Sequence, residues 1–175
     1  MIYVGLGSDE DEESVRVLHP QHPSLMCGDG FLMIARDDRQ IIGFAWAFER
    51  SIPAPIGGVH EAFINFIAVN DGFRKVGIGS RLVQACIKKA AENGCYQVRA
   101  YCDIRNVASH RLWLKNGFGI SPIKMQDDSI PGSFVTYVIG QKEFPAHKSE
   151  ENWQRRKPHE RSTERLHLAY SHFHL

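Results

Sequence analysis

Long apolar runs and an excess of charge of one sign are both missing from this sequence of 175 residues. No stretch approaches the roughly 20 apolar residues of a membrane-spanning helix, and the N-terminus lacks the basic and apolar segments of a signal peptide. Its 21 basic and 20 acidic side chains give a net charge of +1, without the basic field typical of a nucleic-acid-binding domain. We therefore expect a cytoplasmic protein with no membrane partner, and nucleic acid is not the expected partner.

Cysteine is also scarce. The four cysteines show neither the paired spacing of zinc ligands nor the density of a disulfide scaffold, which favours a reducing compartment. His167, His172 and His174 gather near the C-terminus, without a carboxylate or cysteine that would complete a metal site. We expect no bound metal.

The length and the composition fit one soluble globular domain, with 43% hydrophobic and 23% charged residues. We place this domain at residues 1–141 and a polar, basic tail at 142–175. The tail holds seven of the 21 Lys and Arg residues and five of the nine His residues. We expect it to cover exposed core or to dock on a second subunit in a homodimer. A contact with nucleic acid through its arginines is a weaker alternative.

The hydrophobic pattern predicts a mixed α/β layout. Aromatic and β-branched residues at 61–69 indicate a strand buried on much of both faces, and two prolines with two glycines at 51–58 indicate an irregular loop. The expected order is strands at 31–35, 41–48 and 61–69, a helix from 77 to 94, a strand at 96–102, a helix at 106–116, and strands at 118–125 and 133–139.

Five consecutive acids, residues 9–13, follow Ser8. Ser8 can cap a short helix here, because acidic side chains in a first turn suit the positive end of the helix dipole. Runs of charge are more often only a solvated face, and we favour that interpretation. Pro20 and Pro23 would end any helix in this region.

Residues 69–82 join the buried strand to a helix through a loop with several glycines. Backbone N–H groups at such a junction have no intrahelical acceptor, and the helix dipole adds partial positive charge, so the junction suits a phosphate group. Glycine lets an anion approach the amides closely, and Arg74, Lys75 and Arg81 add positive charge. The Walker and Rossmann glycine patterns are both absent.

The pattern Arg74-x-x-Gly77-x-Gly79 resembles the pyrophosphate loop of the GNAT N-acetyltransferase superfamily. A second signature of that family is similar to the helix that Asn106 opens and that ends at Gly117-Phe118. The resemblance covers about residues 31 to 140. It implies an α/β (α+β mixed) fold with a central, mostly antiparallel sheet flanked by helices.

The resemblance also implies an activity. Family members use acetyl-CoA as co-substrate and move its acetyl group to a primary amine by direct attack in a ternary complex. The acceptor would be a small-molecule or peptide amine. The alternative is a sensor of the same fold that binds acyl-CoA without turning it over.

By the same resemblance, the pantetheine arm would pair with the backbone of Ile67 and Val69, in a gap between strands 63–69 and 96–102. A backbone N–H of Ile67 or Val69 would donate to the developing oxyanion. Asn106 would reach the pantetheine or act as a plain helix cap, and the two roles are compatible. The implied cofactor-binding residues are Ile67, Ala68, Val69, Arg74, Lys75, Val76, Gly77, Ile78, Gly79, Ser80 and Asn106.

A base must take a proton from the attacking ammonium. Glu61 is the first candidate, directly or through water, and His60 is the second. Neighbouring residues of a strand face opposite sides, so at most one of the two points at the thioester. The remaining alternative is an exposed pair, with ordered water or another residue taking the proton.

The general acid that would protonate the departing thiolate is where the sequence departs from the family pattern, because Trp113 stands where many members carry tyrosine. Indole N–H donates hydrogen bonds but is no practical acid, so Trp113 would only steady the sulfur or, as we favour, pack in the core. Tyr101 is a candidate replacement hydroxyl. Cys102 as an acyl carrier and His110 as a site residue are both weaker than a core cysteine and a surface histidine.

Overall fold

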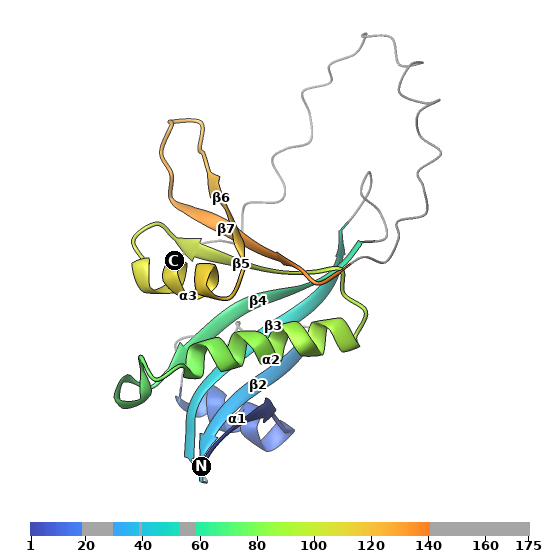
Figure 1. Ribbon diagram of the computed structural model, residues 1–175, viewed down its shortest axis with the longest axis vertical. Helices are drawn as coiled ribbons and strands as arrows, with labels where there is room; N and C mark the ends of the chain where they lie inside the picture. Colours follow the sequence, from blue (N-terminus) through green and yellow to red (C-terminus); the bar gives the residue numbers. More distant parts are fainter. Residues whose placement is uncertain (19–29, 39, 53–58, 141–175) are drawn as a thin grey trace. The chain divides into compact units, whose positions relative to one another are not determined.

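The computed structural model describes residues 1–18, 30–38, 40–52 and 59–140 of the chain (Figure 1). By its internal contacts the chain divides into two units, Met1–Lys142 and Glu143–Leu175, and every described residue belongs to the first. The predicted boundary at residue 141 stays a prediction. The elements in order are β1 (Ile2–Leu6), α1 (Asp9–Leu18), β2 (Gly30–Asp37), β3 (Gln40–Ile52), β4 (Val59–Val69), the 3-10 turn η2 (Asp71–Phe73), α2 (Ile78–Glu92), β5 (Gln97–Asp103), α3 (Val107–Lys115), β6 (Gly119–Ile123) and β7 (Gly132–Val138).

The sheet has seven strands in the order β1-β2-β3-β4-β5-β7-β6. Every neighbouring pair is antiparallel except β4 and β5, which run parallel. The prediction of a mixed, mostly antiparallel sheet with helices is therefore confirmed. Among the described helices, none is long and apolar enough to cross a membrane.

β1 corrects the predicted order, which began with the strand at residue 31. Its five residues pair with β2 from Ile2 opposite Asp37 to Leu6 opposite Met33. Ile2, Tyr3 and Val4 are residue types enriched in strands. The strand is only five residues long, contains Gly5 and lies at the edge of the sheet, and pairing with the longer β2 completes it.

β3 also differs from the prediction, because it runs through Ser51 to Ile52 instead of ending at residue 48. Its last residue pairs with Val59, so the β3–β4 ladder extends into the segment expected to be a loop. The remainder of that predicted loop, residues 53–58, lies outside the described residues.

Helices cover the sheet on both faces. α2 crosses β2, β3 and β4 (Figure 1) and buries a stripe with helical spacing that includes Leu82, Cys86 and Ala90. These side chains pack with Trp113 of α3 and one face of the sheet. Val15 of α1 packs with the opposite face, against a smaller cluster of Leu32, Ile34, Phe44 and Trp46.

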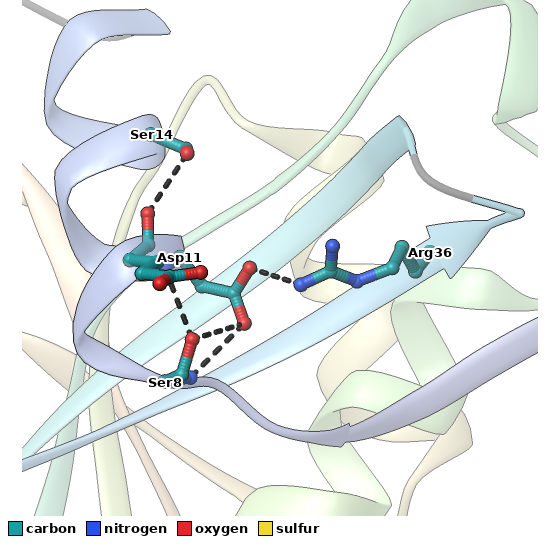
Figure 2. Close-up of polar contacts among 5 residues, drawn as sticks. Ser8, Asp11, Ser14 and Arg36 are labelled. Atoms are coloured by element: carbon teal, nitrogen blue, oxygen red, sulfur yellow. Dashed lines mark hydrogen bonds and ion pairs between the residues drawn. The ribbon is translucent and has the colours of Figure 1, made fainter.

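The start of α1 corrects our interpretation of the acidic run as only a solvated face. The backbone N–H of Ser8 donates to Asp11 Oδ2 at 3.0 Å, and the backbone N–H of Asp11 donates to Ser8 Oγ at 3.3 Å. Figure 2 shows this reciprocal cap and the ion pair between the Asp11 carboxylate and Arg36 of β2. Such a capping box satisfies amides that lack intrahelical partners. Asp11 is buried, while Asp9, Glu10 and Glu13 are exposed, so the run holds one structural acid among solvated ones.

Candidate active site

β4 and β5 pair over only part of their length. Their parallel ladder runs from Glu61 opposite Gln97 to Ile64 opposite Ala100 and ends there. At the same point Asn65 is an extra residue in β4, because Trp46 of β3 lies opposite Phe66 and Ala47 lies opposite Ile64. A bulge bends and twists its strand. The separation of the two strands therefore begins after Ile64, slightly later than the gap predicted from residue 63.

The loop between β4 and α2 has two residues with left-handed backbone. Lys75 has φ 64° and Gly77 has φ 92°. A positive φ costs a lysine conformational energy, and strain of this kind concentrates at functional sites. Gly77 is the N-cap of α2 and makes no side-chain capping hydrogen bond. The first amides of α2 thus lack a side-chain cap and suit an anion.

Gly79 has no packing reason to be glycine. A Cβ built on it would lie 3.4 Å from the nearest atom, on Leu112, which is an ordinary van der Waals contact. Its backbone is also not in the left-handed region, in contrast to Gly77. Packing therefore does not require glycine at position 79. A glycine in the first turn of a helix lets a ligand approach the backbone closely.

The two arginines of this region, Arg74 and Arg81, contact backbone carbonyl oxygens. Arg74 Nε donates to the carbonyl of Val69 at 2.8 Å, and a second nitrogen pairs with Asp71 at 2.7 Å. Arg81 donates to the carbonyl of Ile2 at 3.0 Å. Lys75 and Val76 are exposed, whereas the side chain of Ile78 is buried in the core, so only its backbone faces the loop.

A hydrogen bond joins the two sequence signatures. Asn116 Nδ2 donates to Ser80 Oγ at 3.2 Å and to the carbonyl of Leu112 at 2.8 Å, while Gln84 donates to Asn116 Oδ1 at 3.1 Å. Asn116 is one of the few buried polar residues. The sequence analysis did not single it out, because an asparagine before glycine indicates only a helix end.

α3 begins with the cap that the sequence allowed. Asn106 Oδ1 accepts from the backbone N–H of Ser109 at 3.0 Å. One turn on, Trp113 Nε1 donates to Ser109 Oγ at 2.8 Å, and its ring lies 5.0 Å from that of Phe118. Trp113 is only 1% exposed. Its single donor is engaged and its ring is in the core, as in the interpretation that we favoured.

Cys102 and His110 come together at the end of β5. Cys102 Sγ lies 3.2 Å from His110 Nδ1, a contact that the interpretation of His110 as a plain surface residue did not include. Burial raises the pKa of the Cys102 thiol, although a hydrogen bond with Ser109 acts in the opposite direction. The thiol therefore stays protonated at neutral pH, which suits a core cysteine and not an acyl carrier.

Glu61 is fully buried between two donors on neighbouring strands. Its Oε1 accepts from Arg50 Nε at 2.7 Å and its Oε2 accepts from Gln97 Nε2 at 2.6 Å. Arg99 lies 3.8 Å from Oε2. Each carboxylate oxygen of the first-choice base thus already accepts one hydrogen bond.

Tyr101 follows Arg99 on the same face of β5, at the point where the ladder with β4 has ended. It is 40% exposed, and its ring packs edge-on against Phe134. Burial and the nearby Asp103 carboxylate raise the pKa of its hydroxyl. The hydroxyl therefore keeps its proton at neutral pH.

His60 points to the other face of β4. Its Nε2 lies 3.1 Å from Glu49 Oε2, and donor atoms of Glu49, His60 and Cys95 all lie within 4.8 Å of one another. This group has the donor types of a zinc site, but it has one ligand fewer than a structural site and its imidazole and carboxylate already bond to each other. The expectation of no bound metal stays a prediction.

Comparisons with known proteins agree with this geometry. The family model described as the GNAT acetyltransferase family matches residues 6–118. Mycothiol acetyltransferase of Paenarthrobacter aurescens is 28% identical over 90 residues, which are 51% of this chain and 27% of that protein. The chloroplastic GCN5-related N-acetyltransferase 4 of Arabidopsis thaliana is 32% identical over 57 residues, 33% of this chain and 20% of that protein. These matches thus span about a quarter and a fifth of the relatives' own lengths.

Solved structures share the fold at low identity. NAA60 of Arabidopsis thaliana, in complex with acetyl-CoA, has a TM-score of 0.62 and 17% identity, covering 79% of this chain and 99% of that one. The ribosomal-protein-S18-alanine N-acetyltransferase of Escherichia coli has a TM-score of 0.62 and 14% identity, covering 82% and 99%. The family model covers more than half of the sequence. The chain therefore belongs to the GNAT acetyltransferase family.

Proposed function

We propose that the protein is an N-acetyltransferase that moves the acetyl group of acetyl-CoA to a primary amine by direct attack in a ternary complex. Family membership and the uncapped start of α2 beside Gly79 support this function. The observation that carries this proposal is Gly79. The fold has room for a larger side chain at this position, whereas a pyrophosphate bound to the nearby amides would fill that room.

In the proposed complex, backbone amides of residues 74–80 hold the pyrophosphate, and Arg74, Lys75 and Arg81 neutralise its charge. Arg74 and Arg81 now donate to carbonyl oxygens and would exchange them for phosphate oxygens. The pantetheine and thioester lie along Ile67, Ala68 and Val69, where β4 has left β5. The Asn106 side chain caps α3 beside them.

The amine nitrogen attacks the thioester carbonyl carbon, and the carbonyl oxygen becomes negative until the C–S bond breaks. A backbone N–H of Ile67 or Val69 donates to that oxygen. The attacking nitrogen loses a proton to a base, and the departing sulfur, which takes the electron pair of the C–S bond, gains a proton.

Tyr101 is the proposed donor of that proton. Its backbone lies where the strands separate, and its raised pKa keeps the hydroxyl protonated. The side chain leans over Gly132 and Phe134 of β7, so it must turn toward the gap to reach the sulfur. Trp113 supports the packing of α3 in this proposal, because its N–H is already bonded to Ser109. Glu61 acts through water if it takes the amine proton, since its side chain is fully buried. His60 remains the second candidate base.

The alternative, an acyl-CoA sensor without turnover, rests on Trp113 at the position of the usual tyrosine. Both functions require binding, but only the enzyme releases free CoA in proportion to an added amine. Incubating the protein with acetyl-CoA and a panel of amines, while following thiol release, separates them. Amine-dependent release above the uncatalysed rate excludes the sensor.

Binding itself is tested by calorimetry with acetyl-CoA and with two glycine variants. Gly79→Trp should abolish binding, because the indole would fill the space above the α2 amides. Gly119→Trp is the matched control, since Gly119 is exposed on the edge strand β6 and the nearest atom to a Cβ there lies at 3.9 Å. Absence of binding to the wild type, or unchanged binding by Gly79→Trp, would refute the proposed site.

The proposals for the tail fall on residues 142–175, outside the described part of the chain. If the tail docks on core or on a second subunit, truncation after Gln141 lowers the melting temperature or changes the oligomeric state. Loss of a gel shift with nucleic acid on the same truncation would instead favour the weaker alternative. A cytoplasmic location also stays a proposal.

A further inference from the structure

Two arginines flank the buried Glu61 on one face of the sheet. Arg50 of β3 lies directly opposite Glu61, and Arg99 lies opposite Phe63 on the other side of β4. Alternate residues of a strand share a face, so Arg50 shares the face of Trp46, against which α1 packs. The arginines are accessible, with 45% and 24% of their side chains exposed.

Aromatic rings hold both guanidinium groups. Arg50 Cζ lies 4.9 Å from the ring centre of Phe63 and 5.6 Å from that of Phe48. Arg99 Cζ lies 4.5 Å from the ring centre of Phe134. Stacking fixes the plane of a guanidinium while its edge stays available for hydrogen bonds. The entropic cost of ordering the two side chains is thus already met in the free protein.

The charges of this group do not balance. Arg50 and Arg99 contribute two positive charges against the single negative charge of Glu61. Each oxygen of Glu61 accepts one hydrogen bond, from Arg50 Nε or from Gln97 Nε2, and at 3.8 Å Arg99 forms an ion pair with Glu61 without a hydrogen bond. The terminal nitrogens of Arg50 and the fork of Arg99 therefore remain as donors for one further anion.

The distance of Arg99 from the gap between β4 and β5 sets the length of the ligand. Arg99 lies two residues before Tyr101 on the same face, and the β4–β5 ladder ends between them at Ala100. Two residues of strand span about 7 Å. A ligand whose amine enters the gap beside Tyr101 would thus present an anion to Arg99 at about 7 Å from the amine, and Arg50 approaches from the other side of Glu61.

We propose that Arg50 and Arg99 form an acceptor subsite that selects primary amines carrying a carboxylate about 7 Å from the amine. This inference rests on the proposed acetyltransferase function. A planar carboxylate matches the fork of an arginine, and its single negative charge neutralises the one positive charge by which the two arginines exceed Glu61. A dianionic phosphate would bring two negative charges, one more than the subsite neutralises.

The test uses equilibrium binding, so that it does not depend on turnover. Calorimetry of the full chain with CoA present compares 6-aminohexanoate with hexylamine, which has the same chain length and no carboxylate. We expect the carboxylate ligand to bind at least about tenfold more tightly, as charge-assisted hydrogen bonds imply. Arg99→Gln and Arg50→Gln should each bring the ratio of the two affinities close to one.

Three further samples make the result specific. Arg111→Gln, an exposed arginine of α3, should keep the wild-type ratio. Arg99→Lys should give an intermediate ratio, because it keeps the charge and loses the fork. Circular dichroism melts confirm that each variant is folded, and Arg99→Lys remains informative if Arg99→Gln unfolds.

Equal affinity for the two ligands, no binding of either, or an unchanged ratio in both glutamine variants would overturn the subsite. Tighter binding of 6-aminohexyl phosphate than of 6-aminohexanoate would overturn its assignment to carboxylates. The proposed function is judged separately by thiol release from acetyl-CoA. A carboxylate preference in binding without any release would therefore reject the enzyme and keep the subsite.

Discussion

Arg50 and Glu61 lie directly opposite each other across β3 and β4, and Arg50 Nε approaches Glu61 Oε1 to 2.7 Å. Gln97 donates to the other oxygen of the same carboxylate from β5. The three residues thus tie β3, β4 and β5 together immediately before β4 and β5 separate. Glu61 has a structural task at this point, whatever part it takes in proton transfer.

Glu61→Gln should destabilise the protein by about 2 kcal/mol, because it removes a buried negative charge from between two arginines. The expected loss is below that of a fully buried pair, since water still screens Arg50. Urea denaturation measures the free energy of unfolding. Glu92→Gln, at an exposed helix end, is the control, with an expected change within about 0.5 kcal/mol. Equal effects of the two substitutions would contradict the structural task.

Trp113→Phe should lower stability by about 1 to 3 kcal/mol, because it leaves space in the core and removes the bond to Ser109. Thiol release should change by less than a factor of about three once both proteins are folded. Ser109→Ala, which removes only the acceptor, should give a smaller loss of stability. A large fall in turnover with an unchanged melting temperature would instead assign Trp113 to the chemistry.

Tyr101→Phe should lower kcat by a factor of about 10 to 100, at the low end of general acid catalysis because a thiolate is a good leaving group. The pKa of Tyr101 is raised, so the wild-type hydroxyl stays protonated through neutral pH and its loss affects kcat only at strongly alkaline pH. The alkaline decline in a profile of kcat against pH should disappear in the variant. Tyr3→Phe, on the edge strand, should match the wild type, and a Tyr101→Phe profile identical to it would rule Tyr101 out.

Asp11→Asn should destabilise the protein by about 1 to 2 kcal/mol at pH 7, since it weakens both the capping box and the ion pair with Arg36. Burial raises the pKa of Asp11, but hydrogen bonds from Ser8 and Arg36 lower it further, so the net shift is downward. A depressed pKa gives stability that is present above the unfolded value of about 3.9 and is lost as pH falls through the folded value. The difference between wild type and variant should therefore shrink below about pH 4 in thermal melts. A difference that is constant down to pH 2 would contradict the charge contribution.

The core thiols should resist alkylation. Burial raises the pKa of Cys86 to about 12 and that of Cys95 to about 11, the latter with help from Glu49 and Glu61, and burial also raises that of Cys102. At pH 8, roughly one Cys95 thiol in a thousand would be ionised. Peptide mapping after iodoacetamide treatment should show these three cysteines largely unmodified in the native protein and modified in urea. Rapid labelling of native Cys102 would revive the acyl-cysteine route.

The local sequence determined much of the site. The helical spacing of Leu82, Cys86 and Ala90 and the glycines before it predicted α2 and its start at a glycine without a side-chain cap, because both features depend on contacts a few residues apart. The same holds for the β2–β3 hairpin and for the Asn106 cap. Even the cap of α1 was visible in Ser8 and the acids that follow, although the charge run favoured another interpretation.

Only the tertiary structure decided the contacts between distant residues. The partners of Glu61 lie 11 and 36 residues away, and Asn116 reaches Ser80 across another 36. The register of β1 is set by its pairing with β2, and Asn65 is a bulge because β3 has one residue fewer opposite it. Burial and hydrogen bonding at these positions depend on which strands become neighbours, and no local pattern contains that order. The sequence therefore determined where a loop of the acetyl-CoA-binding family can form, and the fold decided that Arg50, Gln97 and Arg99 surround the buried Glu61.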